Sequence, residues 1–282
     1  MKKFTSTDIE NYYDQTEVHY RMFWKLEKVM GLHYGIWNED TKNITEAILN
    51  TNVMLQEMGN INSSDKVLDA GCGIGGSSIF LAKTTGCTTT GISLSKKQVD
   101  TATNLANKNG VGDNCEFYRK DYTQTGFDSE SFDVAWAIES LGSAPDKSLF
   151  FKEMNRILKT GGRVLIADTF KPYRYAINTE KDVQVMLNGW AISDILSIQE
   201  LEEVAKDNGF RLSKINDVTR QIKKSVDLMY QEAILGKIGT RIYNFFRKAS
   251  YFSRIHYTAG LAQKRTYRNG KWGYYLFLFE KI

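Results

Sequence analysis

Four glycines closely follow an acidic residue in the segment "VLDAGCGIGGSS", where Asp69 precedes glycines at positions 71, 73, 75 and 76. Because glycine has no side chain, a ligand can approach its backbone closely. The segment therefore predicts a loop that holds a small molecule. A nucleoside triphosphate does not fit, because Gly75, Gly76 and Ser77 lack the lysine that ends a phosphate-binding loop.

The same glycines leave two other ligand classes to compare. Gly71, Gly73 and Gly76 satisfy the G-x-G-x-x-G pattern of dinucleotide-binding folds. Those folds place an acid about twenty residues further on to bind a ribose, whereas residues 91–98 read "GISLSKKQ". S-adenosylmethionine (SAM) carries an ammonium group instead of a pyrophosphate, and attraction to that group explains Asp69. The remaining alternatives are that Asp69 only caps the next helix, and that the chain is an NAD-dependent reductase.

The residues around this loop predict alternating strands and helices. Helices are expected over 15–30 and 43–58, the second opened by Asn43 and Glu46 in capping-box spacing. After residue 60, helical stretches, one with a capping box from Ser197 to Glu200, alternate with β-rich runs: "KVLDAG", "CTTTGIS", "CEFYRKD", "FDVAWAI", "RVLIADTF" and "YYLFLFEKI". Such alternation predicts a mostly parallel sheet with helices on both faces and a ligand beyond the carboxyl ends of the strands.

The composition is that of a folded protein, with 42% hydrophobic and 12% aromatic residues in a chain of 282. No apolar run follows the N-terminal lysines and none reaches eighteen residues, so we expect no secretory signal, no membrane span and a cytoplasmic location. Three cysteines without C-x-x-C spacing argue against disulfides and a zinc site. No metal is expected, because the histidines and carboxylates lack ligand spacing.

Positive charge is concentrated in residues 220–271, which hold twelve lysines and arginines but two acids, a net charge of +10. Within this segment, "RIYNFFRKASYFSRI" (241–255) is expected to form a helix with aromatic and cationic residues on neighbouring faces. A solvated surface, contact with an anionic membrane and binding of an acidic or phosphorylated acceptor all fit. Nucleic acid is disfavoured, since no recognition fold accompanies the charge.

The motifs "DAGCGIGG", "GISLSKKQ", "RKDY", "FDVAWAIES" and "LKTGGRVLIAD" occur in this order, and the set resembles the class I SAM-dependent methyltransferases from about residue 12 onward. Within that superfamily the chain is most similar to the tocopherol and sterol C-methyltransferases and the cyclopropane-fatty-acid-synthase-like group. The resemblance implies an α/β, Rossmann-like fold with a mostly parallel seven-stranded sheet. It further implies an N-terminal helical lid (1–60), a SAM-binding core (61–219), a basic aromatic helical cap inserted before the last strand (220–272) and that final strand (273–282).

The resemblance also assigns roles to the residues that match the family's motifs, with S-adenosylhomocysteine as the cofactor product and no metal. Those expected to hold SAM are Asp69, Gly71, Cys72 and Gly73 for the methionine end, Ser93, Leu94 and Gln98 for the ribose, and Asp121 and Tyr122 for the adenine. Ile138 and Glu139 would face the sulfonium and the acceptor, while His33, Tyr34 and Trp37 would close the site. The catalytic candidates are Glu139, His33 and Tyr34. The competing interpretations make Gln98 a surface residue and Trp37 a core residue.

The implied activity is methylation, at carbon, of a small lipophilic acceptor of isoprenoid, sterol-like or quinone-like type. Aromatic faces could stabilise a cation formed on such an acceptor, the candidates being Tyr12, Tyr13, Trp24, Trp37 and Trp190. The alternatives are N-methylation of a small amine of glycine, sarcosine or phosphoethanolamine type, and a non-catalytic SAM-binding partner subunit. Gly142 and Ser143 stand where the tocopherol and cyclopropane enzymes have Glu-His, so no mechanism that needs that pair is expected. A homo-oligomer and a peripheral membrane contact are both compatible with these patterns.

Overall fold

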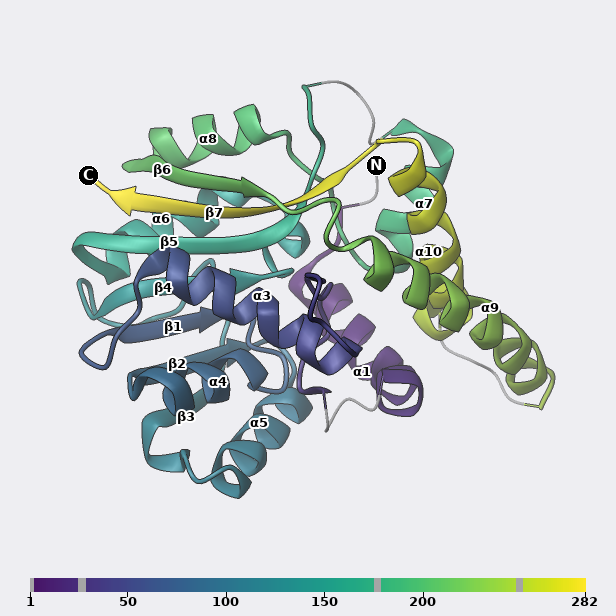
Figure 1. Ribbon diagram of the computed structural model, residues 1–282, viewed down its shortest axis with the longest axis horizontal. Helices are drawn as coiled ribbons and strands as arrows, with labels where there is room; N and C mark the ends of the chain where they lie inside the picture. The colour runs from purple at the N-terminus through teal and green to yellow at the C-terminus, as the bar shows by residue number, and fades with distance from the viewer. Residues whose placement is uncertain (1–2, 25–28, 175–178, 247–250) are drawn as a thin grey trace.

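A seven-stranded sheet with the order β3-β2-β1-β4-β5-β7-β6 runs through the molecule (Figure 1). This computed structural model describes residues 3–24, 29–174, 179–246 and 251–282, without the side chains of 17–24, 238–246 and 253. The strands are β1 (Lys66–Ala70), β2 (Thr88–Ser93), β3 (Cys115–Arg119), β4 (Phe132–Ile138), β5 (Leu158–Phe170), β6 (Phe210–Asp217) and β7 (Gly273–Lys281). The first five are parallel, and β7 is antiparallel to both of its neighbours. The expected Rossmann-like, mostly parallel sheet is confirmed.

The central strands are buried on both faces because their apolar residues alternate between two cores. On β4, Val134 and Trp136 belong to one hydrophobic core, and Ala135 and Ala137 belong to the other. A strand covered on both sides reads as a continuous apolar run, as "FDVAWAI" does. Because β1 to β5 are parallel, their carboxyl ends lie at the same edge of the sheet, and a loop follows each of them.

Helices cover both faces of the sheet (Figure 1). Their bounds are α1 (Ser6–Trp24), α3 (Ile44–Gly59), α4 (Gly76–Thr85), α5 (Lys96–Lys108), α6 (Lys147–Ile157), α7 (Lys181–Gly189), α8 (Ile198–Asp207), α9 (Lys223–Phe246) and α10 (Tyr251–Arg268). Short 3₁₀ turns lie at η1 (Gly112–Asn114) and η2 (Leu141–Ser143). Helices α6 and α8 pack on one face, whereas α3, α4, α7 and α10 contribute to the core on the other. The Ser197–Glu200 capping box is confirmed in both directions at the start of α8.

Two elements differ from the expectations. The first helix begins at Ser6 instead of residue 15, because Thr5 and Asp8 form a reciprocal cap in which each side chain accepts from the other's main-chain N–H. The helix expected over 241–255 falls on two elements, α9 up to Phe246 and α10 from Tyr251, while residues 247–250 lie outside the described residues. Strand β6 was not expected from its own residues, because most of its side chains are exposed and polar.

Candidate active site

The carboxyl ends of β1, β2 and β4 bring together most of the residues expected to bind SAM. Asp69 lies near the end of β1, where its buried carboxylate accepts a hydrogen bond from the Ser78 hydroxyl at 2.7 Å. Burial raises the pKa of Asp69 to about 6, although hydrogen bonds from the hydroxyl and main-chain N–H of Ser78 act in the opposite direction. These bonds hold the first turn of α4. A cationic ligand group would further stabilise the Asp69 carboxylate.

The glycine loop exposes its backbone at one position and packs tightly at another. Gly71 has a φ of +93°, and a Cβ there would lie 2.5 Å from the Cβ of Ser140, whose hydroxyl donates to the Ala70 carbonyl. Gly73 also has a positive φ, but a Cβ on it would meet nothing within 4 Å. The main chain at Gly73 therefore borders open space that a ligand can fill. Cys72 between them is buried, and burial raises the pKa of its thiol, so it offers neutral contacts.

The residues expected to hold a ribose lie at the end of β2 and the start of α5. Ser93 donates to the side-chain carbonyl of Gln98 at 2.7 Å, and both side chains are buried. Gln98 is therefore no ordinary surface residue. Leu94 packs against an apolar cluster that includes Phe4 and Tyr12. This cluster brings the start of the chain next to the residues expected to bind the ribose.

The residues expected to hold an adenine follow β3. One oxygen of Asp121 accepts from the main-chain N–H and hydroxyl of Thr123 at 2.8 and 2.7 Å. Tyr122 donates from its hydroxyl to the Ser140 carbonyl at 2.8 Å, which links the loops after β3 and β4. Three pairs, spaced four residues apart on α1, join that helix to this edge: Ser6 with Asp121 (2.9 Å), Glu10 with Arg119 (2.8 Å) and Asp14 with Ser95 (2.7 Å).

Glu139, directly after β4, has the most unusual environment at this edge. Its φ of +47° is rare for a residue with a side chain, and such outliers gather at functional sites. The carboxylate accepts from the main-chain N–H of Tyr34 at 2.6 Å. Burial, and then the charge of Asp168, raise the pKa of Glu139 to about 8. The buried hydroxyl of Tyr274 on β7 lies beside this carboxyl without good hydrogen-bond geometry.

Asp168 and Tyr274 are site residues that the sequence reasoning missed, whereas Tyr13 was already a candidate for stabilising a cation. Asp168 lies near the end of β5, where it accepts from the main-chain N–H groups of Thr169 (2.7 Å) and Gly142 (3.2 Å). Burial raises the pKa of Asp168. Burial, together with the charges of Glu139 and Asp168, also raises the pKa of Tyr13 to about 12. An acid near the end of a predicted strand, as in "RVLIAD", was the signal available for Asp168.

Gly142 and Ser143, the dipeptide that departs from the Glu-His pattern, have defined contacts here. The Gly142 N–H donates to Asp168, and the Ser143 side chain lies close enough to the Tyr13 hydroxyl to lower its pKa. This short turn therefore links the end of β5 to helix α1. The position holds hydrogen-bonding groups, although neither a carboxylate nor an imidazole stands there.

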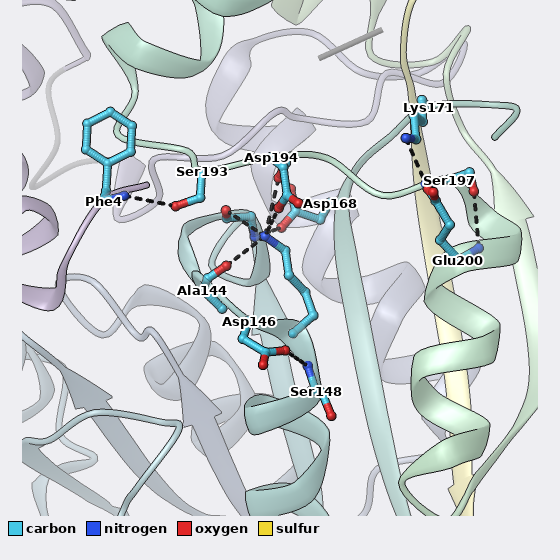
Figure 2. Close-up of polar contacts among 12 residues, drawn as sticks. Phe4, Ala144, Asp146, Ser148, Asp168, Lys171, Ser193, Asp194, Ser197 and Glu200 are labelled. Carbon is cyan, nitrogen blue, oxygen red and sulfur yellow. Dashed lines mark hydrogen bonds and ion pairs between the residues drawn. The ribbon is translucent and has the colours of Figure 1, made fainter. Parts of the chain in front are cut away.

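The amine of Lys147 anchors the same turn through Ala144 and Asp194, which Figure 2 shows close together. Only 6% of this lysine is exposed, and its amine donates to the Ala144 carbonyl at 2.7 Å and to the Asp194 carboxylate. The neighbouring Ser193 hydroxyl accepts from the main-chain N–H of Phe4 at 3.2 Å. The turn after β4, the segment after α7 and the start of the chain are thus joined. Because Lys147 is already paired, it does not present a cation to an anionic acceptor.

His33, Tyr34 and Trp37, expected to close the site, behave differently from one another. The His33 Nδ1 hydrogen-bonds to the Tyr34 carbonyl at 3.0 Å, its Nε2 is buried without a partner, and burial lowers its pKa to about 4. The Tyr34 hydroxyl donates to Gln263 at 2.8 Å, so Tyr34 reaches Glu139 only through its main chain. The Trp37 indole donates to Ser225 on α9 at 2.9 Å, with Lys224 above its ring.

Aromatic rings pack around Tyr34 and Tyr13, two residues that lie beside Glu139. The Tyr34 ring packs edge-on against Tyr274 and Trp190, with ring centroids 5.6 and 6.5 Å apart. Tyr12 packs on Tyr13 at 5.0 Å. The side chain of Trp24 lies outside the described residues. Within the described ranges, no group of three or more His, Cys, Asp or Glu residues could hold a metal ion, and no helix is long and apolar enough to cross a membrane.

Comparison with known proteins identifies the chemistry of this site. Residues 68–166 match the family model described as a methyltransferase domain. The chain is 30% identical over 197 residues to 27-O-demethylrifamycin SV methyltransferase of Amycolatopsis mediterranei, a match that covers 69% of this chain and 71% of that protein. The chain belongs to the class I SAM-dependent methyltransferases.

Two further similarities place this methyltransferase among its relatives. It is 31% identical over 218 residues to cycloartenol-C-24-methyltransferase 1 of Oryza sativa subsp. japonica, which covers 75% of this chain and 61% of that protein. Its fold matches that of a cyclopropane synthase from Mycobacterium tuberculosis with a TM-score of 0.81 at 17% identity, over 99% of each chain. SAM is therefore the methyl donor, and the residues at Asp69 and Gly73 fit it: a buried carboxylate for its ammonium group and open backbone for its close approach.

Proposed function

We propose that this methyltransferase methylates a carbon atom of a small lipophilic acceptor of isoprenoid, sterol-like or quinone-like type. The observation that carries the proposal is Glu139, a part-buried carboxyl with a raised pKa and a strained backbone beside Asp168 and a group of aromatic rings. An apolar acceptor fits such surroundings, and a carboxylate there can stabilise a cation formed on it. The sterol methyltransferase among the relatives supports the same acceptor class.

Bound SAM supplies an electrophilic methyl group, and the chain's own residues handle the cation and the proton. Once an alkene carbon has taken the methyl group, the acceptor carries a positive charge and must lose a proton. The Glu139 carboxylate accepts that proton, while the ring faces of Tyr13, Tyr274 and Trp190 stabilise the cation. The negative charge of Asp168 makes the electrostatic potential around Glu139 more negative. Asp168 keeps its own hydrogen bonds from Gly142 and Thr169.

For the cofactor we propose the roles that the family motifs imply. Asp69, Gly71, Cys72 and Gly73 hold the methionine end, and Ile138 faces the sulfonium. Ser93, Leu94 and Gln98 hold the ribose, with Asp121 and Tyr122 at the adenine. The burial of Ser93 and Gln98 and the open backbone at Gly73 support this arrangement.

A hydroxyl acceptor is the second candidate, because one of the relatives named above is a 27-O-demethylrifamycin SV methyltransferase. A base whose pKa lies near neutral pH could remove that hydroxyl proton, and Glu139 has a pKa of about 8. Methylation of a small amine requires instead that a water-soluble acceptor reach the same carboxylates.

The test uses SAM labelled with ¹³C on its methyl group, incubated with the protein and a total cell extract that is then partitioned between organic solvent and water. We expect the label in the organic phase, with the chemical shift of a methyl group on carbon. A methoxy shift would replace the proposal with the hydroxyl acceptor, and label only in the water would favour the amine. Glu139→Gln should slow labelling by about 10²- to 10⁴-fold, whereas Glu130→Gln should not, because Glu130 shares the positive φ but is exposed. No labelled product in any phase would favour a non-catalytic SAM-binding subunit.

A further inference from the structure

The hairpin of α9 and α10 carries a surface that the methyl-transfer chemistry does not use. The two helices pack antiparallel, with Gly260 against Ala233 and Gly236 against Tyr257. In Figure 1, α9 leads away from the sheet toward the end of the hairpin. Its outward residues include Ile234, which is 42% exposed, and Leu235, which is 61% exposed. Ile234 and Leu235 are adjacent apolar side chains that are both exposed to solvent on a helix that projects from the sheet. Exposed apolar residues of this kind indicate a binding surface.

Beyond Glu232 the charges of the hairpin have one sign, although Lys264, Arg265 and Lys271 are paired with Asp227, Asp182 and Glu180. Residues 233–271 hold nine lysines and arginines and no aspartate or glutamate. Among the described residues, Lys237 lies one turn or less from Ile234 and Leu235 on α9, and the exposed Arg254 follows the exposed Tyr251 on α10. Tyr251 is 46% exposed. Apolar, aromatic and cationic side chains on one helical element are typical of helices that lie in the surface of an anionic bilayer.

The hairpin is also joined directly to the acceptor side of the active site. Gln263 on α10 accepts from the Tyr34 hydroxyl, and the main-chain N–H of Tyr34 donates to Glu139. Phe252 on α10 packs edge-on against Tyr12 of α1 at 5.4 Å. A bilayer bound by the hairpin would therefore lie next to the elements that frame Glu139.

We propose that the α9–α10 hairpin docks on the surface of an anionic phospholipid bilayer. Ile234, Leu235 and Tyr251 enter the boundary between headgroups and acyl chains, while Lys237 and Arg254 contact the phosphates. Docking brings the site to the phase in which a lipophilic acceptor is dissolved. The inference goes beyond the proposed function, and the hairpin's binding to lipid does not depend on which acceptor is methylated.

Vesicle sedimentation with the full chain tests the docking. Phosphatidylcholine vesicles with phosphatidylglycerol should pellet the protein at low salt, whereas vesicles of phosphatidylcholine alone should not. Each cation near an anionic leaflet strengthens binding about fivefold, so the double variant Lys237→Glu with Arg254→Glu should weaken it by more than about twentyfold. Ile234→Ser with Leu235→Ser should weaken it as well, because less apolar area is buried.

Two matched controls keep the result specific to the hairpin. Leu149→Ser removes an equally exposed leucine on α6, and Lys206→Glu reverses an exposed lysine on α8, so neither should change pelleting. The inference is overturned if anionic vesicles do not pellet the wild type, if neutral vesicles pellet it as well, or if the controls lose as much as the hairpin variants. If the labelling experiment with SAM gives label only in the water phase, the proposed lipophilic acceptor is wrong, but the vesicle result still tests the docking.

Discussion

Glu139→Gln keeps the volume and the acceptor oxygen of the Glu139 side chain but removes its charge. The main-chain N–H of Tyr34 can still donate to the amide oxygen, so the fold around β4 should survive. What is lost is a group that can accept a proton. A positioned general base typically contributes about 10²- to 10⁴-fold to the rate, and we expect a loss in that range at pH 8.

The pH dependence follows from the shift in pKa. A rise from the ordinary value of 4.5 to about 8 means that the surroundings disfavour the carboxylate by about 5 kcal/mol, at 1.36 kcal/mol per unit. The active form is the carboxylate, so kcat/KM should rise with pH and level off above about 8. Between pH 6 and pH 8 the ionised fraction of the free enzyme grows about fiftyfold.

The assay is kcat/KM for the labelled acceptor from pH 5.5 to 9.5, with protein stability checked at each pH. Glu139→Gln should give a flat profile over the rising limb. Asp168→Asn should move the limb to lower pH, because it removes the charge that adds to the effect of burial on the pKa of Glu139. A Glu139→Gln variant that keeps the same rising limb would refute the base role of Glu139.

Three further perturbations separate cofactor binding from folding. Asp69→Asn should weaken SAM binding about tenfold to a hundredfold by calorimetry, and wild-type affinity should fall as the pH drops through about 6, where Asp69 becomes protonated in the free protein. Gly73→Ala should raise the Kd for SAM, because its Cβ enters the open space proposed for the cofactor, and should lower Tm through its positive φ alone. Gly71→Ala should lower Tm further, because its Cβ also meets Ser140. An unchanged Kd in Gly73→Ala would contradict the proposed cofactor position. Lys147→Met should lower the free energy of unfolding by about 3 kcal/mol in denaturant titration by leaving buried carbonyls without a donor, and an unchanged midpoint would show that the buried amine contributes nothing.

Local signals in the sequence were sufficient to predict which residues of the proposed cofactor half lie close together. The glycines, Asp69 and the pair Ser93 and Gln98 lie within about thirty residues of one another, on consecutive strand–helix units whose ends must meet at one sheet edge. Their position at one sheet edge follows from the strand–helix pattern, whereas their roles toward SAM are what the family resemblance implies. Glu139 follows the same rule, since it comes directly after the apolar run of β4.

The acceptor half was less predictable because its residues come from distant segments. Tyr13 lies on α1 and Tyr274 on β7, and nothing in their own neighbourhoods says that both approach Glu139. Helix α1 was placed too late because the cap formed by Thr5 and Asp8 lies in a polar stretch before the apolar periodicity begins. Strand β6 was missed for a related reason: an edge strand with polar side chains has no apolar pattern to reveal it.

The position of β7 has a consequence for synthesis of the chain. Strand β6 pairs only with β7, and β7 also completes the pairing of β5. Residues 218–272 therefore leave the ribosome while β6 has no partner and one edge of β5 is open. Unpaired strand edges invite association between chains, and the exposed, polar side chains of β6 reduce that hazard. Since Tyr274 arrives with the same strand, the sheet and the surroundings of Glu139 are completed together, after the helical hairpin has been made.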